Sequence, residues 1–540
     1  MATFAGCLAV VSFGARAQPA PPAPQINPGL INNQNQQNRQ QIEQQNNLPQ
    51  VPSVVSGPRA EPKINIPGGP NFKLLAVKID ESHFLSRAEL DAITAKYVGT
   101  EVDIARVQKM VQEINDLFAA KGIVTAAAYL PPQDVKDGTI QVKIVEGRLE
   151  KMSVTGATNL SPDFALSHVS QKPGEIVDVH QVARDVAVFN KTGVARMQAL
   201  LQPGGQFGLT DIELAVTEPP QDTAQFFIDN QGVSSVGSLE GGFLYQRYAP
   251  LGIDDKFTLY LVKSGGDISG NIGYNVPLGS SGGRIGLSFT RGAIKVIDGP
   301  YESLGVRGDS EVVSLNASQP IYANTDWLVL LIASVSHVTS SSTQNFVPIT
   351  DNHTLLETAG FNFNYGDADV TATLSPTLSY GHSSADVSQL NTNFLLQSGT
   401  YNVSAHLPDD FNLSLGGAWQ ASSKEVLPGD QLFQLGGPTT VRGYSPDVVA
   451  GSSGYYANLE LHHALPILDN GIDAFAFYDR GTVYNSFPTE QTLDSLGLGF
   501  SWNAAKYFSA ELTAGFPIDT VVNTQSDYEI YFRVSLRLDD

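Results

Sequence analysis

The feature that most constrains this chain is an alternation of apolar and polar residues that recurs from about Gln225 to the C-terminus. The last such segment, from Tyr528 to Leu538, carries apolar side chains at every second position, with Glu529 and Arg533 between them. Successive side chains of a β-strand point to opposite faces, so this period of two predicts strands with one apolar face. Segments of this kind, separated by turns, fill the last part of the chain and predict an all-β region.

Three features favour a transmembrane antiparallel barrel for this region. The segments have roughly the ten residues that a tilted membrane strand needs, aromatic residues recur near their ends, and an export signal precedes them. We count about sixteen strands from Thr223 to the C-terminus, an even number as in bacterial barrels. No run of about 18 to 20 apolar residues follows the signal, so a membrane form of this protein has to be a closed barrel. A soluble β-sandwich would alternate too and is the non-membrane alternative.

The N-terminus has the character of an export signal followed by a polar segment. Residues 1–17 contain the apolar stretch FAGCLAVVSF and end in Ala-Arg-Ala, which is typical of a signal-peptide cleavage site, although a basic start is missing. This suggests that the true start codon lies upstream. Residues 18–48 are rich in Asn and Gln, and they lack Pro and Gly from Leu30 to Leu48. Disorder and an all-polar helix in a water-filled place are both consistent with this composition.

Between this polar segment and the β-rich region, two α+β units follow one another. Residues 72–147 have the order strand, helix, helix, strand, strand, and residues 148–220 repeat it. Ser86 with Glu89 three residues later marks the start of the first helix, and Gly122 marks the end of the second. The chain therefore contains an internal tandem repeat of small modules.

Composition and local motifs argue against several classes of function. The net charge of −22 is opposite to that of a nucleic-acid-binding protein. The single cysteine, Cys7, lies in the expected signal, so the mature chain offers neither a disulfide nor a cysteine metal site. The sequence from Gly279 to Gly283 fits G-x-S-x-G but has strands on both sides, which predicts a hairpin turn. His462 and His463 are adjacent on a strand and face opposite ways. We expect no enzyme activity, no cofactor and no metal.

One long loop contains the stretch Gln434 to Asp447, QLGGPTTVRGYSPD, which holds an arginine. The loop lies between the expected strands eleven and twelve. If the α+β modules are periplasmic, every loop after an odd strand is outside the cell, so this is the sixth outer loop. Arg442 on such a loop could also be a solvated cation.

These motifs resemble those of the two-partner secretion transporters, the TpsB or haemolysin-activator-like family. The stretch from Tyr129 to Gly147 is similar to the end of the first POTRA module of that family. TTVRGY resembles its sixth-loop signature, and FAFYDRGTV, from Phe475 to Val483, is similar to its strand-thirteen motif. The resemblance covers nearly the whole mature chain and implies two periplasmic POTRA domains, 72–147 and 148–220, before a barrel at 223–540.

The resemblance also implies a site inside the barrel. It carries the family's loop motif onto Val441, Arg442, Gly443 and Tyr444, and the lumenal partner motif onto Phe477, Asp479 and Gly481. In such transporters the sixth loop folds into the lumen and its arginine meets the strand-thirteen aspartate. An arginine in a narrow, partly dehydrated lumen needs an acceptor, and a carboxylate provides a two-pronged one. The alternative is that Asp479 is merely a turn residue.

The function implied is secretion of a partner protein across the outer membrane of a Gram-negative bacterium. The partner would bind the POTRA modules through strand edges and thread a monomeric barrel that contacts outer-membrane lipid. Leu30 to Leu48 would be the plug helix and residues 49–71 the linker. An assembly insertase of the same superfamily is the main rival, and a passive porin would not need the modules. The chain ends in SLRLDD, whereas such barrels usually end on an aromatic residue.

Overall fold

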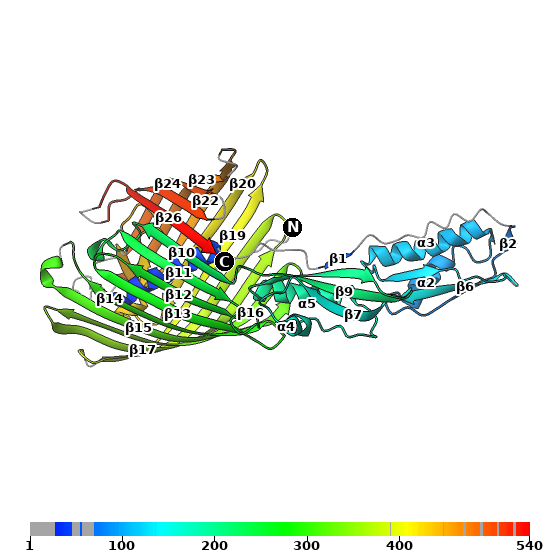
Figure 1. Ribbon diagram of the computed structural model, residues 1–540. Helices are drawn as coiled ribbons and strands as arrows, with labels where there is room; N and C mark the ends of the chain where they lie inside the picture. The colour runs from blue at the N-terminus through cyan, green and yellow to red at the C-terminus, as the bar shows by residue number, and fades with distance from the viewer. Residues whose placement is uncertain are drawn as a thin grey trace.

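A computed structural model describes residues 27–45, 54–56, 70–135, 137–299, 301–388, 390–446, 448–467, 471–486, 490–504, 507–521 and 525–540. The expected signal peptide and most of the expected linker lie outside these residues. A large β-barrel forms one end of the molecule, and two small α+β modules extend in line from it (Figure 1). In the described part of the chain, no helix is both long and apolar enough to cross a membrane.

The barrel is antiparallel and closed, because β26 pairs with β10 along most of its length. In the described residues sixteen strands form its wall, which confirms the predicted fold class. The strands are β10 (Asp222–Asp229), β11 (Glu240–Tyr248), β12 (Lys256–Lys263), β13 (Asp267–Leu278), β14 (Gly283–Lys295), β15 (Val306–Ala323), β16 (Trp327–Gln344), β17 (Val347–Gly366), β18 (Val370–Ala385), β19 (Leu390–Leu407), β20 (Phe411–Ser422), β22 (Val449–Leu465), β23 (Ile472–Ser486), β24 (Gln491–Ala504), β25 (Phe508–Pro517) and β26 (Glu529–Asp539).

The alternation in the sequence places apolar side chains on the outside of the wall. On β24, Leu496, Leu498 and Phe500 are about half exposed. Ser495, which precedes Leu496 and points to the opposite face, is fully buried. Such an outward apolar band is what lipid contact requires. The central strands are longer than expected, and β17 reaches 20 residues. The strands are longer because their pairing continues beyond the apolar band. Pairing there still gives the backbone N–H and C=O groups their hydrogen-bond partners.

The first module packs two helices on a small sheet of strand order β3-β6-β5. Ser86 and Glu89 form the expected capping box at the start of α2. Gly122 follows α3 with φ +71°, a conformation that favours glycine. Its elements are β2 (Phe72–Lys73), β3 (Ala76–Ile79), α2 (Arg87–Thr94), β4 (Glu101–Val102), α3 (Ile104–Ala120), β5 (Ala126–Tyr129) and β6 (Thr139–Glu146).

The second module repeats this topology. Its first strand pairs in parallel with its last, as in the first module, and the strand after the second helix pairs antiparallel with the last. Its elements are β7 (Arg148–Thr155), α4 (Pro162–Ser167), α5 (Val179–Thr192), β8 (Arg196–Pro203) and β9 (Leu209–Thr217). A further short strand, β1 (Val54–Ser56), pairs in parallel with β8. The region 49–71, expected only as a linker, therefore contributes a strand to this sheet.

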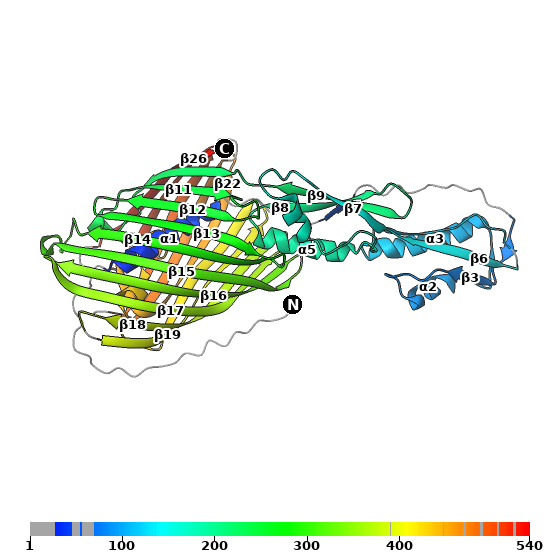
Figure 2. The same cartoon turned by 60° about the horizontal axis from the view of Figure 1, so that its bottom comes forward.

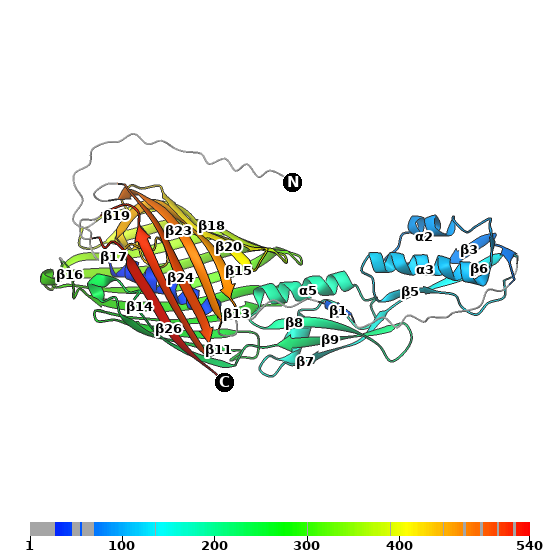
Figure 3. The ribbon, with the colours of Figure 1, turned by 90° about the horizontal axis from the view of Figure 1, so that it is seen from above.

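The second module contacts the barrel through several groups, among them one buried carboxylate. Asp254, in the turn after β11, accepts hydrogen bonds from the backbone N–H groups of Val194 and Ala195 at 2.9 Å. Arg284 at the start of β14 forms an ion pair with the same carboxylate at 3.0 Å. The helix α5 of the second module lies nearest to the barrel (Figure 3).

The polar segment near the N-terminus forms a helix, α1 (Pro28–Gln45), inside the barrel (Figure 2). Pro28 occupies its first position, where a missing N–H costs nothing. Its apolar residues Leu30, Ile31 and Ile42 are buried, and Ile42 packs among inward-facing residues that include Phe227 and Tyr260. Of the two alternatives that the composition left open, the structure therefore has the helix.

Candidate functional site

The sixth outer loop folds into the barrel instead of extending away from it. It joins β20 to β22, the eleventh and twelfth strands of the wall, which is the position predicted by strand count. It contains a short 3-10 helix, η3 (Gly429–Gln431), and a strand, β21 (Phe433–Leu435), that pairs with the start of β22. Val441 and Tyr444 are fully buried, and Arg442 is 8% exposed. The tip of the loop is therefore enclosed by the wall.

The structure brings Arg442 and Asp479 together in a two-pronged contact. The Nε and Nη2 atoms of Arg442 donate to the two carboxylate oxygens of Asp479, each at 2.7 Å. The backbone N–H of Arg442 donates to the same carboxylate at 3.0 Å. Asp479 is 0% exposed on β23, the thirteenth strand. Three charge-assisted hydrogen bonds to one buried carboxylate fix both the side chain and the backbone of the loop.

Two further groups surround the guanidinium. The carbon Cζ of Arg442 lies 3.6 Å from the ring centre of Phe477, a close cation–π contact. Its Nη1 atom lies 2.5 Å from Oε1 of Glu460 on β22. Glu460 was not predicted from the sequence, although its position between the outward-facing Leu459 and Leu461 is a pattern that indicates a lumenal side chain. Two carboxylates therefore face one guanidinium.

The neighbours of Arg442 in the loop motif also make specific contacts with the barrel wall. Gly443 has φ +92°, and a Cβ there would lie 3.0–3.1 Å from backbone atoms of residues 515–517. Tyr444 places its hydroxyl 2.9 Å and 3.0 Å from the carbonyl oxygens of Asp494 and Asp519. Tyr531 donates its hydroxyl hydrogen to the carbonyl oxygen of Tyr444 at 2.6 Å. These contacts tie the loop to strands at the end of the chain.

Glycines on the wall make room for the loop. A Cβ at Gly481 would lie 2.8 Å from Cδ1 of Leu435, so the apolar base of the loop lies directly against this glycine. Leu435 packs in one buried cluster with Val441 and Tyr444. Gly515 on β25 has the same role under the tip of the loop, where a Cβ would lie 2.5 Å from the nitrogen of Gly443. The sequence reasoning did not identify Gly515, because nothing local distinguishes it from other strand glycines.

The helix α1 lies between the wall and the loop. Toward the wall, Asn35 donates to Asp267 at 3.1 Å and Arg39 donates to Asn271 at 2.6 Å. Toward the loop, Asn33 donates to the carbonyl oxygen of Asp430 at 3.3 Å, and Thr439 donates to Gln37. These contacts of α1 are hydrogen bonds that water can replace.

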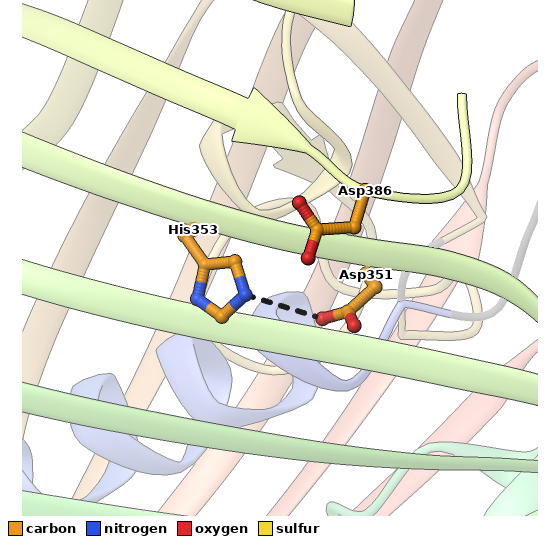
Figure 4. A group of neighbouring side chains, drawn as sticks. All are labelled: Asp351, His353 and Asp386. Atoms are coloured by element: carbon orange, nitrogen blue, oxygen red, sulfur yellow. Dashed lines mark ion pairs between the residues drawn. The ribbon is translucent and has the colours of Figure 1, made fainter. Parts of the chain in front are cut away.

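Among the described residues, three side chains could approach one metal ion. They are Asp351 and His353 on β17 and Asp386 after β18, near the outer rim, with their nearest ligand atoms within 4.8 Å of one another (Figure 4). His353 and Asp351 form an ion pair at 3.6 Å. The cluster is partly exposed, and an ordinary surface ion pair explains it. We assign it no function.

The remaining motifs fall where the sequence predicted. Gly279 to Gly283 forms the hairpin turn between β13 and β14. His462 faces Glu460 and Asp473, whereas the ring of His463 stacks on Phe411. The two histidines therefore lie in different surroundings, as expected for neighbours on a strand.

Comparison with known proteins agrees with this architecture. Residues 72–147 match the family described as POTRA domain, ShlB-type, and residues 208–503, more than half of the chain, match haemolysin secretion/activation protein ShlB/FhaC/HecB. The outer membrane transporter CdiB of Dickeya dadantii is 24% identical over 93% of this chain and 92% of its own length. The heme/hemopexin transporter protein HuxB of Haemophilus influenzae is 21% identical over 82% and 83%.

Solved structures show the same fold. CdiB from Escherichia coli superposes with a TM-score of 0.71 at 19% identity, covering 95% of this chain and 99% of that one. BamA from Haemophilus ducreyi, lacking POTRA domains 1-3, is more distant, with a TM-score of 0.51 at 14% identity, covering 87% of this chain and all of that one. The chain therefore belongs to the ShlB/FhaC/HecB family of haemolysin secretion/activation proteins, and it is an outer-membrane transporter of two-partner secretion whose POTRA region lies in the periplasm.

Proposed function

We propose that this protein secretes one partner protein through its barrel after recognising it with two POTRA domains, at residues 72–147 and 148–220. The single observation that carries this proposal is the contact between Arg442 and Asp479. A passive pore has no need to hold a loop inside its lumen with three hydrogen bonds to one carboxylate. A pathway for an unfolded chain does need an element that closes the lumen and can be displaced.

The lumen contains two such elements, α1 and the sixth loop. A chain can pass only if at least α1 leaves. The composition of α1 suits this movement, because Asn and Gln side chains exchange hydrogen bonds with lumenal groups for hydrogen bonds with water at small net cost. The loop, with its buried ion pair, is the more firmly held element. We therefore assign α1 as the removable plug and the loop as the fixed gate.

Transport in this scheme involves no covalent step and no cofactor. The residues of the site hold the loop in place, and none of them is arranged as a nucleophile with a base. Directionality would come from folding of the secreted protein outside the cell. The barrel closes on itself through β10 and β26, so a single chain suffices for the wall, and its outer apolar band would contact lipid.

The direct test is secretion of a partner. The transporter is co-expressed with a large exported β-helical protein encoded in the neighbouring reading frame, and the partner is measured in the medium and at the cell surface. We expect secretion to require the transporter and to stop with the Arg442→Ala variant, which should still reach the outer membrane. If the partner remains periplasmic with the intact transporter, while assembly of other outer-membrane proteins depends on it, the insertase alternative is correct.

A further inference from the structure

In each module, an asparagine side chain makes a pair of hydrogen bonds with the strand at one edge of the sheet. In the first module, Asn115 of α3 accepts from the N–H of Ala128 at 2.7 Å and donates to its carbonyl oxygen at 3.1 Å. In the second, Asn190 of α5 makes the same pair of bonds with Met197, at 2.6 Å and 2.8 Å. Both asparagines lie on the second helix of their module and bind the strand that follows it. The strands β5 and β8 are therefore equivalent.

After the residue that the asparagine binds, the two edge strands differ. In the second module β8 continues, and two residues after Met197 the strand β1 pairs with Ala199–Leu201. In the first module, Ala128 corresponds to Met197, and the positions three and four residues after Ala128 are Pro131 and Pro132. Proline has no N–H to donate, so it stops the addition of a strand. Among the described strands, none pairs with the outer edge of β5. The edge of β8 is therefore the one suited to an added strand, and a segment of the chain itself occupies it.

The strand on this edge is joined to the helix inside the barrel by a short connection. Eight residues separate Gln45, at the end of α1, from Val54 at the start of β1. Nine residue steps span at most roughly 30 Å. The C-terminal end of α1 points toward the periplasm, since Glu43 pairs with Lys256 at the inner end of β12 at 3.6 Å. While β1 is bound, α1 thus stays close to its seat at a high effective concentration.

We propose that β1 is a latch for α1, and that the edge of β8 is a docking surface for an extended segment of the secreted partner, which displaces β1. Loss of β1 from the edge lowers the effective concentration of α1 at its seat, so the lumen opens when partner binds. This proposal rests on the proposed function for its partner, but the latch itself can be tested without one. The segment that fits resembles β1, with β-branched residues and no proline in the paired positions.

The first test measures ion conductance of the purified full chain in planar bilayers. Val55→Pro removes a backbone donor from the middle of β1 and should raise the occupancy of the conducting state on the order of tenfold. Val55→Thr keeps the donor and the β-branch and is the matched control, with conductance expected as in the unaltered chain. Deletion of residues 28–45 reports what an unplugged pore conducts. If deletion opens the pore and Val55→Pro leaves it closed, the latch is wrong and the plug stands.

The second test fixes the latch covalently. Val55 and Leu200 are paired across β1 and β8, and paired residues of neighbouring strands have Cα atoms within the reach of a disulfide. A variant with Val55→Cys and Leu200→Cys should stay closed when oxidised and gain secretion when reduced, with each single variant as a control. Secretion that is equal in both states would overturn the latch. Failure of the unaltered chain to secrete would instead refute the proposed function.

The third test asks whether the edge can be exchanged. The probe is a synthetic peptide of residues 51–57, VPSVVSG, added from the periplasmic side at millimolar concentration. It should compete with β1 and raise conductance, whereas a peptide with proline in place of Val55 should not. The oxidised cysteine pair should abolish the response. No response in the reduced or unaltered chain would overturn the assignment of this edge as a docking surface.

Discussion

A Cβ atom on Gly515 would lie 2.5 Å from the backbone nitrogen of Gly443 and 2.8 Å from the carbonyl carbon of Arg442. The tip of the sixth loop and the strand β25 thus approach each other backbone to backbone. No real Cβ is accommodated at such a distance, and a backbone cannot turn aside as a flexible side chain can. The guanidinium reaches Asp479 only because both of these positions are glycine.

We therefore predict that Gly515→Ala displaces the loop without disturbing the wall. Secretion should fall to near the level of Arg442→Ala, and cysteine accessibility at the loop tip should increase. Gly241→Ala, at a barrel position where no atom lies within 4 Å of an added Cβ, is the control. Normal secretion by Gly515→Ala would show that the loop does not need this close approach.

Replacing Arg442 should release the loop through an electrostatic effect. Arg442→Ala leaves the fully buried Asp479 without a charged partner, a situation that costs about 3–5 kcal/mol. Arg442→Lys retains the charge but cannot make the two-pronged contact, so secretion should be intermediate. The exposed Arg291, paired with Glu311 on the outer wall, should tolerate alanine.

The double variant Arg442→Ala with Asp479→Ala tests whether the unpaired carboxylate of Asp479 is what destabilises the closed loop in Arg442→Ala. Removal of both partners eliminates the unpaired carboxylate, so the closed loop should be more stable than in Arg442→Ala alone. Protease protection of the loop in intact cells measures this. Equal protection in the single and double variants would mean that Asp479 does not hold the loop.

Removing α1 should open the pore. Deletion of residues 28–45 should raise conductance in planar bilayers, because the hydrogen bonds from Asn35 and Arg39 to the wall would be replaced by water. Heat-modifiable migration of the barrel is the control for assembly. Unchanged conductance of a correctly assembled deletion variant would mean that α1 does not close the lumen.

The second α+β module, residues 148–220, should lose stability in mild acid. Burial chiefly lowers the pKa of His168 below its ordinary value of 6.5, against the carbonyl oxygen of Phe164 and the charge of Asp254, which raise it. The folded state therefore favours the neutral ring. The stabilisation is present above the unfolded pKa and is lost as pH falls through the folded one. Hydrogen-exchange protection of α5, corrected for intrinsic rates, should fall toward pH 5, and His168→Phe should reduce that dependence.

The sequence determined everything that depends on local periodicity. Alternation fixed which face of each strand meets lipid, and strand count placed the arginine loop after the eleventh strand. The cap at Ser86 and the glycine at 122 set helix ends from neighbouring residues alone. The motif residues Arg442 and Asp479 came from resemblance, and the chemistry of a buried guanidinium supported pairing them.

Only the tertiary structure decided what depends on contacts between distant segments. The position of α1 in the lumen, the fit of Gly515 under Gly443 and the pairing of β1 with β8 each join residues far apart in the chain. No local pattern encodes these contacts, because a polar helix, a strand glycine or a three-residue strand has the same local sequence wherever it packs. Closure of the barrel brings these segments together, and their function follows from that proximity.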